Sequence, residues 1–379
     1  MKKICCVMMI LLLLPGMVPV ASAQRSLGLS AQSAVLIDAH TLQVLYAHNA
    51  HTPMPVASTT KIMTTLLLLE AGEPELSFIT TEQMVQVEGT SMGLRAGDTV
   101  TRQALAVGLL LASGNDAANA TAIHLAGSLP EFAQLMNARA RAIGMTNSNF
   151  VTPSGLDAEG HLSTAFDMAL LGAAAIANPD FRAISSQSSM RAYFGNPPTL
   201  HYLRNHNRLV REIPGCIGIK TGFTRAAGRT LVSAVERDGR TLIAVTLRAP
   251  NDWQDHRRLF EFGFAQYRNM QLDIAGDVVA RLPITNGMVS HANILLASTP
   301  TAYLQARPQH VQRVLLLRPF EFAPLQAGSV VGTARYYDGT LLLAETPLIV
   351  QSTVDIARPS RSSAQPSLWR RLRRALPFF

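Results

Sequence analysis

The order in which strand-like and helix-like segments follow one another constrains the fold most strongly. Short runs with the alternating or β-branched pattern of strands occur near the start of the chain and return after residue 216. They lie at 34–37, 44–46, 217–224, 230–235 and 241–247. Helical patterns fill the middle and follow the last strand, at 58–71, 101–112, 116–127, 130–143, 163–177 and 252–267. This order predicts an α+β fold, with an antiparallel sheet that is built from both ends of the segment and flanked by helices.

After Asn269 the helical patterns stop and strand patterns replace them. The expected strands lie at 278–282, 311–317, 329–336 and 340–350. Asp338-Gly339 is typical of a hairpin turn between the last two. We therefore expect a small all-β domain at 271–356 that follows a larger first domain at 24–270.

The first 23 residues have the pattern of an export signal. Lys2 and Lys3 precede an apolar run from Cys5 to Leu14, and Ala21-Ser22-Ala23 offers a cleavage site with small residues. A retained membrane anchor is the alternative, but the run is shorter than the ~20 residues that a spanning helix needs. Cleavage would leave a mature chain that begins at Gln24.

The last residues, 357–379, have a second membrane-related pattern. ARPSRSSAQPS (357–367) is typical of a linker, and LWRRLRRALPFF follows it. On a helix, Leu368, Trp369 and Leu372 would share one face, with the arginines opposite. This pattern predicts a short basic amphipathic helix that lies on a membrane surface and is too short to span it. A disordered tail is the alternative.

Composition and charge exclude other classes of protein. Hydrophobic residues make up 48% of the chain and charged residues 15%, which favours a folded protein over a disordered one. The net charge of +8 belongs to the predicted signal and to six arginines after residue 357, so the body is close to neutral. A neutral body lacks the basic face of a nucleic-acid-binding domain, and we expect no nucleic-acid partner. Cys216, the cysteine of the mature chain, is interpreted as a passive apolar side chain.

Three short motifs carry the candidate chemistry: Ser58-Thr59-Thr60-Lys61, Ser113-Gly114-Asn115 and Lys220-Thr221-Gly222. Each is weak alone. Together, in this order and on a helix start, a loop between helices and a strand, they are a strong signal. The chain has 33 basic residues, and only four of them are lysines. Lys61 and Lys220 are the two outside the predicted signal. Lysine can lose its proton when its pKa is shifted, whereas arginine cannot.

Ser58 and Lys61 are spaced for acid–base chemistry. Residues three apart share one side of a helix, so Lys61 is expected beside the hydroxyl of Ser58. A serine hydroxyl becomes a good nucleophile only when a base takes its proton. Burial and a second cation, Lys220, would both lower the pKa of Lys61 and so make it a base. At a helix start, backbone N–H groups near Ser58 would also favour developing negative charge.

With these motifs the chain resembles penicillin-binding D-alanyl-D-alanine carboxypeptidases, the low-molecular-mass serine peptidases of bacterial cell walls. The resemblance covers nearly the whole mature chain. It rests on PVASTTKIMT (55–64), LLLASGNDAANA (109–120), TPSGLDAEGHLSTAFDMALL (152–171), NRL (207–209) and GIKTGFTRAAGRTLVSA (218–234). It implies removal of the terminal D-alanine from peptidoglycan pentapeptide stems and covalent inhibition by β-lactams. It also implies an exported enzyme, bound peripherally at the periplasmic face of the inner membrane.

The resemblance implies a role for each motif residue. Ser58 would be the nucleophile, Lys61 its general base, and Ser113 the relay of a proton to the leaving amine. Six residues would bind substrate: Asn115, Lys220, Thr221, Gly222, Phe223 and Arg248. Asn115 would bond the substrate amide, and Lys220 and Thr221 would bind its carboxylate. The backbone N–H groups of Ser58 and Phe223 would form the oxyanion hole. Arg248 would supplement Lys220 at the carboxylate, or else be a solvated arginine at a strand end.

No metal or cofactor is expected. The histidines lack the spacing of metal ligands, and no glycine-rich phosphate-binding loop is present. His161 invites comparison with a serine–histidine pair, but the preferred interpretation is a histidine that orders a loop beside the site.

Three other functions fit parts of the pattern. A class A β-lactamase shares the first and third motifs but needs a deacylating glutamate between the second and third, whereas Glu73 and Glu75 precede the second. A DD-endopeptidase of the same fold would cut cross-bridges, and crosslinked muropeptides would reveal it. A non-catalytic wall-binding scaffold would not need intact Ser58, Lys61, Ser113 and Lys220.

Overall fold

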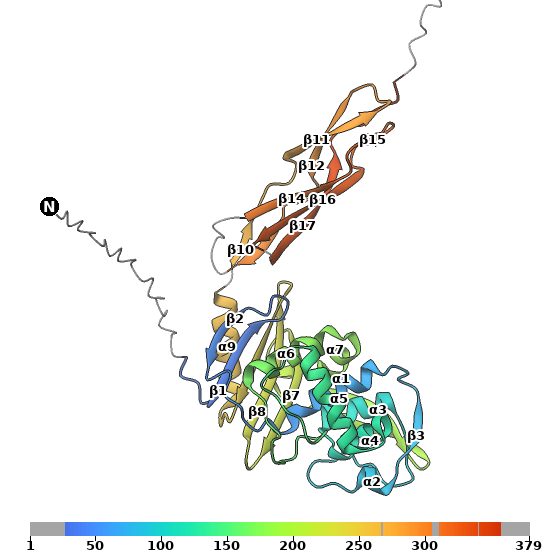
Figure 1. Ribbon diagram of the computed structural model, residues 1–379, viewed down its shortest axis with the longest axis vertical. Coiled ribbons are helices and arrows are strands. Elements are labelled where there is room, and N and C mark those ends of the chain that lie inside the picture. Colours follow the sequence, from blue (N-terminus) through green and yellow to red (C-terminus); the bar gives the residue numbers. More distant parts are fainter. Residues whose placement is uncertain (1–26, 267, 305–310, 340, 358–379) are drawn as a thin grey trace, which may run out of the picture.

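A five-stranded antiparallel sheet forms the centre of the first part of the molecule. The structure, a computed structural model, describes residues 27–266, 268–304, 311–339 and 341–357. The sheet has the order β2–β1–β9–β8–β7. Its strands are β1 (Ser33–Asp38), β2 (Val44–His48), β7 (Cys216–Thr224), β8 (Gly228–Arg237) and β9 (Arg240–Leu247). Strands from both ends of this segment therefore pair with one another, as the sequence predicts (Figure 1).

Both faces of this sheet are covered by helices. In β1, Val35 and Ile37 join the apolar core beneath α1 (Lys61–Glu70) and α6 (Ala165–Ala177), while Ala34 and Leu36 join a second core beneath α9 (Asp252–Ala265). This alternation follows from the two-residue period of a strand, which sends successive side chains to opposite faces. The central strands are therefore apolar on both sides, and the sheet is the middle layer of three (Figure 1).

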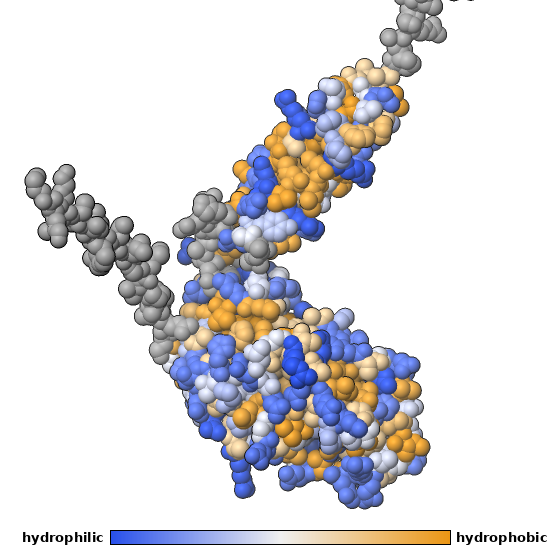
Figure 2. All heavy atoms as spheres, in the orientation of Figure 1, coloured by the Kyte–Doolittle hydropathy of each residue, from blue (hydrophilic) through white to orange (hydrophobic). Residues whose placement is uncertain are grey.

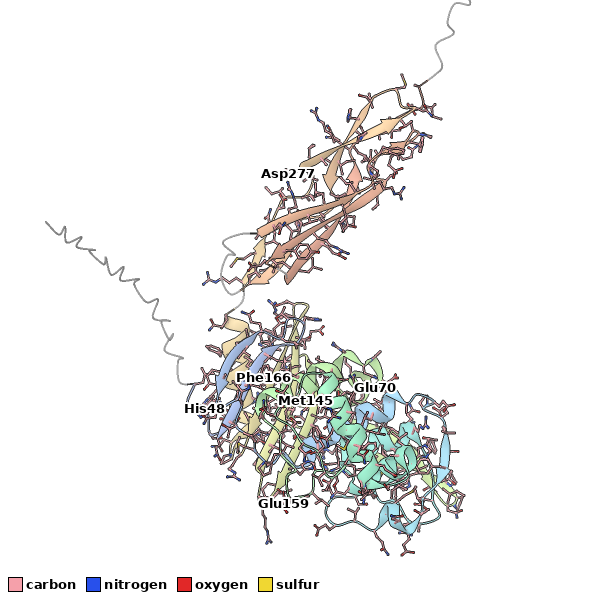
Figure 3. The ribbon with its side chains drawn as sticks, in the orientation of Figure 1. His48, Glu70, Met145, Glu159, Phe166 and Asp277 are labelled. Atoms are coloured by element: carbon pink, nitrogen blue, oxygen red, sulfur yellow. The ribbon has the colours of Figure 1, made fainter. Side chains whose placement is uncertain are left out.

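The remaining helices lie mainly between β2 and β7. They are α2 (Glu82–Val85), α3 (Arg102–Val107), α4 (Asn115–Ala126), α5 (Leu129–Ala142), α7 (Pro179–Ser185) and α8 (Leu209–Glu212). Hydroxyl groups of Thr101, Ser128 and Thr164 accept backbone N–H groups at the starts of α3, α5 and α6. An ion pair joins Glu70 to Arg139 of α5, with 2.6 Å between Nη2 and Oε1. Glu70 lies at the end of α1 (Figure 3).

Two predicted helices differ in detail. The segment 101–112 contains α3 and then a wider π turn (η2, Gly108–Ala112), so it is not one regular helix. The helix predicted at 116–127 is α4, which begins at Asn115, so that Asp116 lies inside its first turn. The Asp116 carboxylate accepts N–H groups from Met92 and Leu94, and therefore holds a neighbouring loop.

A four-stranded sheet was not predicted. It has the order β3–β4–β5–β6, with β3 (Ser77–Ile79), β4 (Thr99–Thr101), β5 (Ser189–Gly195) and β6 (Pro198–Arg204). β3 and β4 are short, and β5 and β6 expose one face that mixes arginine with tyrosine, which weakens the apolar alternation that marks a strand.

Among the described residues from 268 to 357 the regular elements are all strands, as predicted. Its main sheet has the order β14–β16–β17–β12–β11–β15, beside a pair of strands, β10 and β13. The bounds are β10 (Arg268–Gln271), β11 (Val278–Thr285), β12 (His291–Leu296), β13 (Thr301–Leu304), β14 (Val311–Leu317), β15 (Glu321–Phe322), β16 (Val330–Asp338) and β17 (Leu341–Val350). A separate apolar core, which includes Ile294, Ala334 and Leu348, supports the proposed domain boundary near residue 270.

The predicted export signal at 1–23 and the amphipathic tail lie outside the described residues, apart from Ala357. Within the described ranges, no helix combines the length and apolar character needed to cross a bilayer.

Candidate active site

The first motif begins on a tight turn. Ala57–Thr60 forms a single 3₁₀ turn (η1), and α1 starts at Lys61. The predicted α-helical start at residue 58 is therefore wrong, because Ala57 has a left-handed backbone (φ 50°) and the turn that follows is wound more tightly. Side chains three residues apart eclipse on a 3₁₀ turn, which brings Lys61 over Ser58. Lys61 Nζ lies 2.9 Å from Ser58 Oγ.

Three segments distant in sequence hold this turn in place. Thr230 of β8 donates its hydroxyl to the carbonyl of Val56 at 3.0 Å. Gly155 lies so close that a Cβ there would be 1.9 Å from the carbonyl oxygen of Ala57. Gly222 of β7 lies against the backbone nitrogens of Ser58 and Thr59. The position of Ser58 is therefore set by tertiary contacts and not by the turn alone.

Lys61 is fully buried and makes three hydrogen bonds. Besides Ser58, its Nζ contacts Asn115 Oδ1 at 2.7 Å and the carbonyl oxygen of Ser154 at 2.7 Å. Burial lowers the pKa of Lys61 well below its ordinary value, the charge of Lys220 lowers this pKa further, and Asp116 opposes the shift. A lysine in these surroundings loses its proton far more easily than one in water, which is the property that a general base needs.

The second and third motifs meet beside Ser58. Ser113 has a left-handed backbone (φ 60°) at the end of η2, and its hydroxyl accepts a hydrogen bond of 2.9 Å from Lys220 Nζ. Lys220 also donates to the carbonyl of Thr221 at 2.8 Å. Burial lowers the pKa of Lys220 to about 7. The three motifs thus form two hydrogen-bonded groups at one place, Ser58–Lys61–Asn115 and Ser113–Lys220.

Asn115 is oriented from both ends of its amide group. Its Oδ1 accepts from Lys61, and its Nδ2 donates to the carbonyl of Glu88 at 2.7 Å. An amide nitrogen carries two hydrogens, so a second donor is available to a ligand. The loop that carries Glu88 was not predicted to take part. Thr90 in the same loop donates its hydroxyl to the carbonyl of Ser113 at 2.6 Å.

Gly222 allows β7 to lie directly against the turn that carries Ser58. A Cβ at this position would be 2.4 Å from Thr230 Oγ1, 3.0 Å from the Ser58 nitrogen and 3.1 Å from the Thr59 nitrogen. The backbone N–H of Ser58 therefore lies beside the strand that carries Phe223. This closeness supports the proposed oxyanion hole, which needs donors from both segments.

We expect Gly222→Ala to lower the rate of acylation by ~100-fold, because the added methyl group must push β7 away from Ser58 and displacement near 1 Å costs about that much. The rate is measured with a fluorescent penicillin, and thermal unfolding reports whether the fold persists. An unchanged rate in a folded variant would show that the close approach of β7 to the Ser58 backbone does not contribute to acylation.

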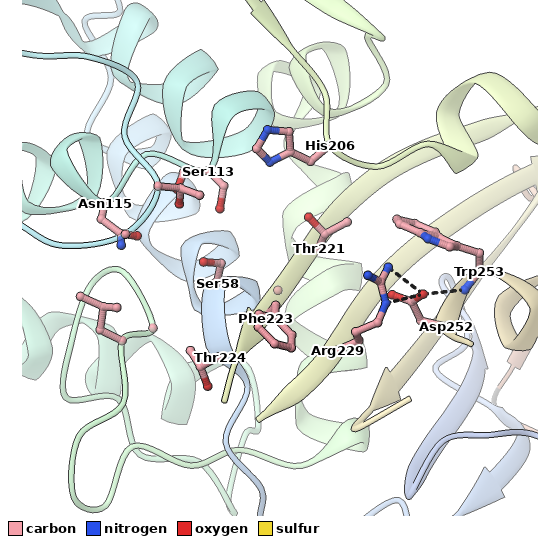
Figure 4. A pocket seen from close by; sticks show the side chains of 15 residues that line it. Ser58, Ser113, Asn115, His206, Thr221, Phe223, Thr224, Arg229, Asp252 and Trp253 are labelled. Atoms are coloured by element: carbon pink, nitrogen blue, oxygen red, sulfur yellow. Dashed lines mark hydrogen bonds and ion pairs between the residues drawn. The ribbon is translucent and has the colours of Figure 1, made fainter. Parts of the chain in front are cut away.

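A cavity of about 380 Å³ opens beside these groups (Figure 4). Ser58, Ser113 and Asn115 line one side, and Thr221, Gly222 and Phe223 line the strand side. Lys61 and Lys220 lie beneath the surface. The lining residues that the sequence analysis did not select include His206, Arg229, Asp252 and Trp253.

Arg229, and not Arg248, is the arginine that lines the cavity. Its Nε and Nη2 lie 3.0 and 2.9 Å from Asp252 Oδ1, and its guanidinium lies 5.3 Å from the ring centroid of Trp253. Arg248 instead donates to the carbonyl of Ala226 and is not among the lining residues. The register of β7 against β8 places Arg229 opposite Phe223, so its identification depends on strand pairing and not on a local sequence signal.

His161 orders a loop, as the preferred interpretation held. Its Nδ1 accepts the N–H groups of Val151 and Thr152, at 3.0 and 3.2 Å, so Nε2 carries the proton and faces Thr60 Oγ1 at 2.9 Å. Burial lowers the pKa of His161 to about 4, which keeps the ring neutral. The loop that it supports supplies the Ser154 carbonyl to Lys61. Across the described ranges, no cluster of three metal-binding side chains occurs.

The arrangement is suited to nucleophilic acyl transfer. The hydroxyl of Ser58 lies against a buried amine of lowered pKa, Lys61, and the hydroxyl of Ser113 lies against a second buried amine, Lys220. Backbone N–H groups border the same space. These are the components of a serine acyltransferase or hydrolase that uses lysine in place of histidine.

Comparisons with known proteins agree with this chemistry. A family model described as D-alanyl-D-alanine carboxypeptidase matches residues 20–251. The D-alanyl-D-alanine carboxypeptidase DacF of Bacillus subtilis is 30% identical over 373 residues, which cover 92% of this chain and 93% of that protein. The D-alanyl-D-alanine endopeptidase of Escherichia coli is 32% identical over 224 residues, 58% of this chain and 72% of that protein. The crystal structure of penicillin binding protein 5 from Haemophilus influenzae superposes with a TM-score of 0.61 and 27% identity, and covers 86% of this chain and 98% of that one.

Proposed function

The chain belongs to the D-alanyl-D-alanine carboxypeptidase family, and from this premise we propose that Ser58 releases the terminal D-alanine of peptidoglycan pentapeptide stems through an acyl-enzyme. The observation that carries the proposal is the contact of 2.9 Å between Ser58 Oγ and the buried Lys61 Nζ. The proposed substrate agrees with the predicted export signal, since the cell wall lies outside the cytoplasm.

Acylation begins when Ser58 Oγ attacks the carbonyl carbon of the penultimate D-alanine. The hydroxyl proton passes to Lys61, whose lowered pKa makes its neutral form accessible. The N–H groups of Ser58 and Phe223 stabilise the oxyanion of the tetrahedral intermediate. The carbon–nitrogen bond then breaks, and the proton that Lys61 accepted passes through Ser113, which Lys220 contacts, to the leaving amine, so that Lys61 is neutral again before deacylation.

Deacylation completes the cycle. Water attacks the ester on Ser58, gives one proton to the base and regenerates the free hydroxyl. A β-lactam would enter by the same attack on its strained amide, but its leaving group stays attached, so the acyl-enzyme persists. The name of the Haemophilus influenzae structure supports this reactivity for a related protein.

The substrate carboxylate is proposed to lie against Lys220, Thr221 and Arg229. Lys220 and Thr221 belong to the third motif, and Arg229 lines the same wall of the cavity. Asp252 and Trp253 hold the Arg229 side chain from two sides, which reduces the conformational freedom lost on binding.

The carboxypeptidase is favoured over the endopeptidase because the carboxypeptidase relative matches a larger share of this chain. DacF matches 92% of this chain, including the β-rich part, whereas the endopeptidase matches 58%. Both proposals use the same nucleophile, so only the substrate separates them.

We expect the mature chain to release D-alanine from a soluble pentapeptide that ends in D-Ala-D-Ala. Crosslinked muropeptides should be cleaved at least ~10-fold more slowly, because their leaving group is a whole peptide. Released D-alanine is measured with a coupled oxidase, and muropeptides by chromatography. Faster cleavage of the cross-bridge would instead favour the endopeptidase.

We expect Arg229→Gln to raise KM for the pentapeptide by ~10-fold, because a hydrogen bond to a charged group contributes about 1.5 kcal/mol. Arg248→Gln is the matched control, since that arginine lies outside the cavity. Its KM should stay within ~2-fold of the parent chain. Equal effects of the two substitutions would remove Arg229 from the proposed carboxylate site.

A further inference from the structure

One end of the C-terminal sheet carries a group of exposed apolar side chains, here called the apolar tip: Met288, Val289, Phe320, Phe322 and Ile356. Their exposed fractions are 72, 50, 46, 57 and 52%. Single exposed apolar residues are ordinary on protein surfaces, but several gathered at one place usually mark an interaction site.

Backbone pairing brings these residues together. Phe322 lies beside Thr285, the last residue of β11, and Phe320 contacts Phe322 edge-to-face with 5.4 Å between ring centroids. In the turn that follows β11, Gly287 pairs with Ile356. Met288 and Val289 follow in the same turn. The apolar tip is therefore formed by three segments, at the end of the sheet where β11 meets β15 (Figure 1). Hydrophobic and hydrophilic residues lie side by side at this end of the molecule (Figure 2).

The described chain ends at this surface. The N–H of Ala357 donates to the carbonyl of Asn286 at 2.8 Å, and the N–H of Met288 donates to the carbonyl of Asp355 at 2.8 Å. These bonds fix the exit of the chain beside Met288. The segment that continues from it, 358–379, contains six arginines, no acidic residue and the sequence LWRRLRRALPFF.

We propose that the apolar tip inserts into the surface of an anionic membrane, as a second contact beside the basic tail. This inference rests on the proposed membrane association of the tail, and it does not depend on the catalytic assignment. Covalent geometry limits the distance between Leu368 and Ala357 to about 40 Å, so a tail on a bilayer keeps the tip close to that bilayer.

The charges at the tip indicate that electrostatic attraction to the membrane comes from the basic tail and apolar burial from the tip. Glu321 is paired with Arg318 at 2.6 Å, whereas Asp355 is exposed and would be repelled by anionic headgroups. Attraction must therefore come from the arginines of 358–379, each of which contributes near an anionic surface. The tip would add apolar burial at the interface, which strengthens binding without a spanning segment.

The test compares two triple variants of the full mature chain on vesicles of phosphatidylglycerol and phosphatidylethanolamine. The tip variant is Met288→Ser, Phe320→Ser, Phe322→Ser. The control is Ile274→Ser, Val278→Ser, Leu342→Ser, which changes residues of similar exposure (56, 51 and 45%) at the opposite end of the sheet, before or at the start of β11 and at the start of β17. We expect the tip variant to lower the membrane partition coefficient by ~10-fold or more, and the control by less than ~2-fold.

The comparison is repeated with four tail arginines changed to Gln: Arg370, Arg371, Arg373 and Arg374. These changes weaken the attraction of the tail to anionic lipid, so the effect of the tip on the partition coefficient is easier to measure. The proposal is overturned if the tip variant and the control bind equally in both backgrounds, or if the parent chain does not bind. A dimer that depends on the tip in the absence of vesicles would also overturn it, in favour of self-association. D-Alanine release from soluble substrate should be equal in all variants, so a failure of the catalytic proposal is recognised separately.

Discussion

Replacing Ser58 with alanine is expected to reduce D-alanine release by ~10⁴-fold or more and to abolish covalent labelling by a fluorescent penicillin. No other hydroxyl lies where Lys61 can activate it next to the same backbone N–H groups among the described residues. Loss of a serine nucleophile in comparable enzymes costs factors of this size, and the remaining activity comes from binding and the oxyanion hole alone.

The control for this result is Ser186→Ala. The Ser186 hydroxyl contacts the carbonyl of Ala183 at 3.2 Å, within the end of α7, and does not line the cavity. Its labelling and its rate should match those of the parent chain. Persistent labelling of the Ser58→Ala variant would assign the nucleophile to another residue.

Replacing Lys61 with methionine is expected to slow acylation by ~10³-fold, within the range that a general base supplies. Methionine has a similar length and no amine, so Ser58 keeps its position but loses its proton acceptor. Lys61→Arg should be equally impaired, because a guanidinium stays protonated. The second-order rate of acylation by a fluorescent penicillin measures both, with thermal unfolding as the check on folding.

The pH dependence of the parent chain gives an independent test of the same role. Protonated Lys61 cannot accept the Ser58 proton, so acylation should fall as the pH drops through the lowered pKa of Lys61. Because this pKa lies well below the ordinary one, the loss should begin far below pH 10. A Lys61→Met variant that keeps its rate within ~10-fold, with the same acidic limb, would assign the base to Lys220.

Much of the fold could be predicted because its signals are local. The strands of the central sheet and the helices α5, α6 and α9 were recognised from periodicity and caps within their own segments. The hairpin of β5 and β6 was missed, because one face of it is exposed and polar or aromatic. Short strands such as β4 have too few residues for any period to be visible.

In the site, too, contacts between residues close in sequence could be predicted, and contacts between distant segments could not. Ser58 and Lys61 are three residues apart on one turn, so spacing was enough to predict their contact. The choice between Arg229 and Arg248 could not be made in this way. It depends on the register of β7 against β8, which places Arg229 opposite Phe223, and on the left-handed backbone of Arg248 (φ 48°) after β9.

The sequence by itself determined which groups are available: a serine and a lysine three residues apart, a second serine, a second lysine, and glycines where the backbone must approach closely. Only the tertiary structure decided that these groups form a reactive site. The pKa of Lys61 depends on burial beneath Asn115 and the Ser154 carbonyl and on the charge of Lys220, groups that lie far away along the chain. Local spacing sets which side chains face each other, whereas desolvation and charge proximity arise only when distant segments meet.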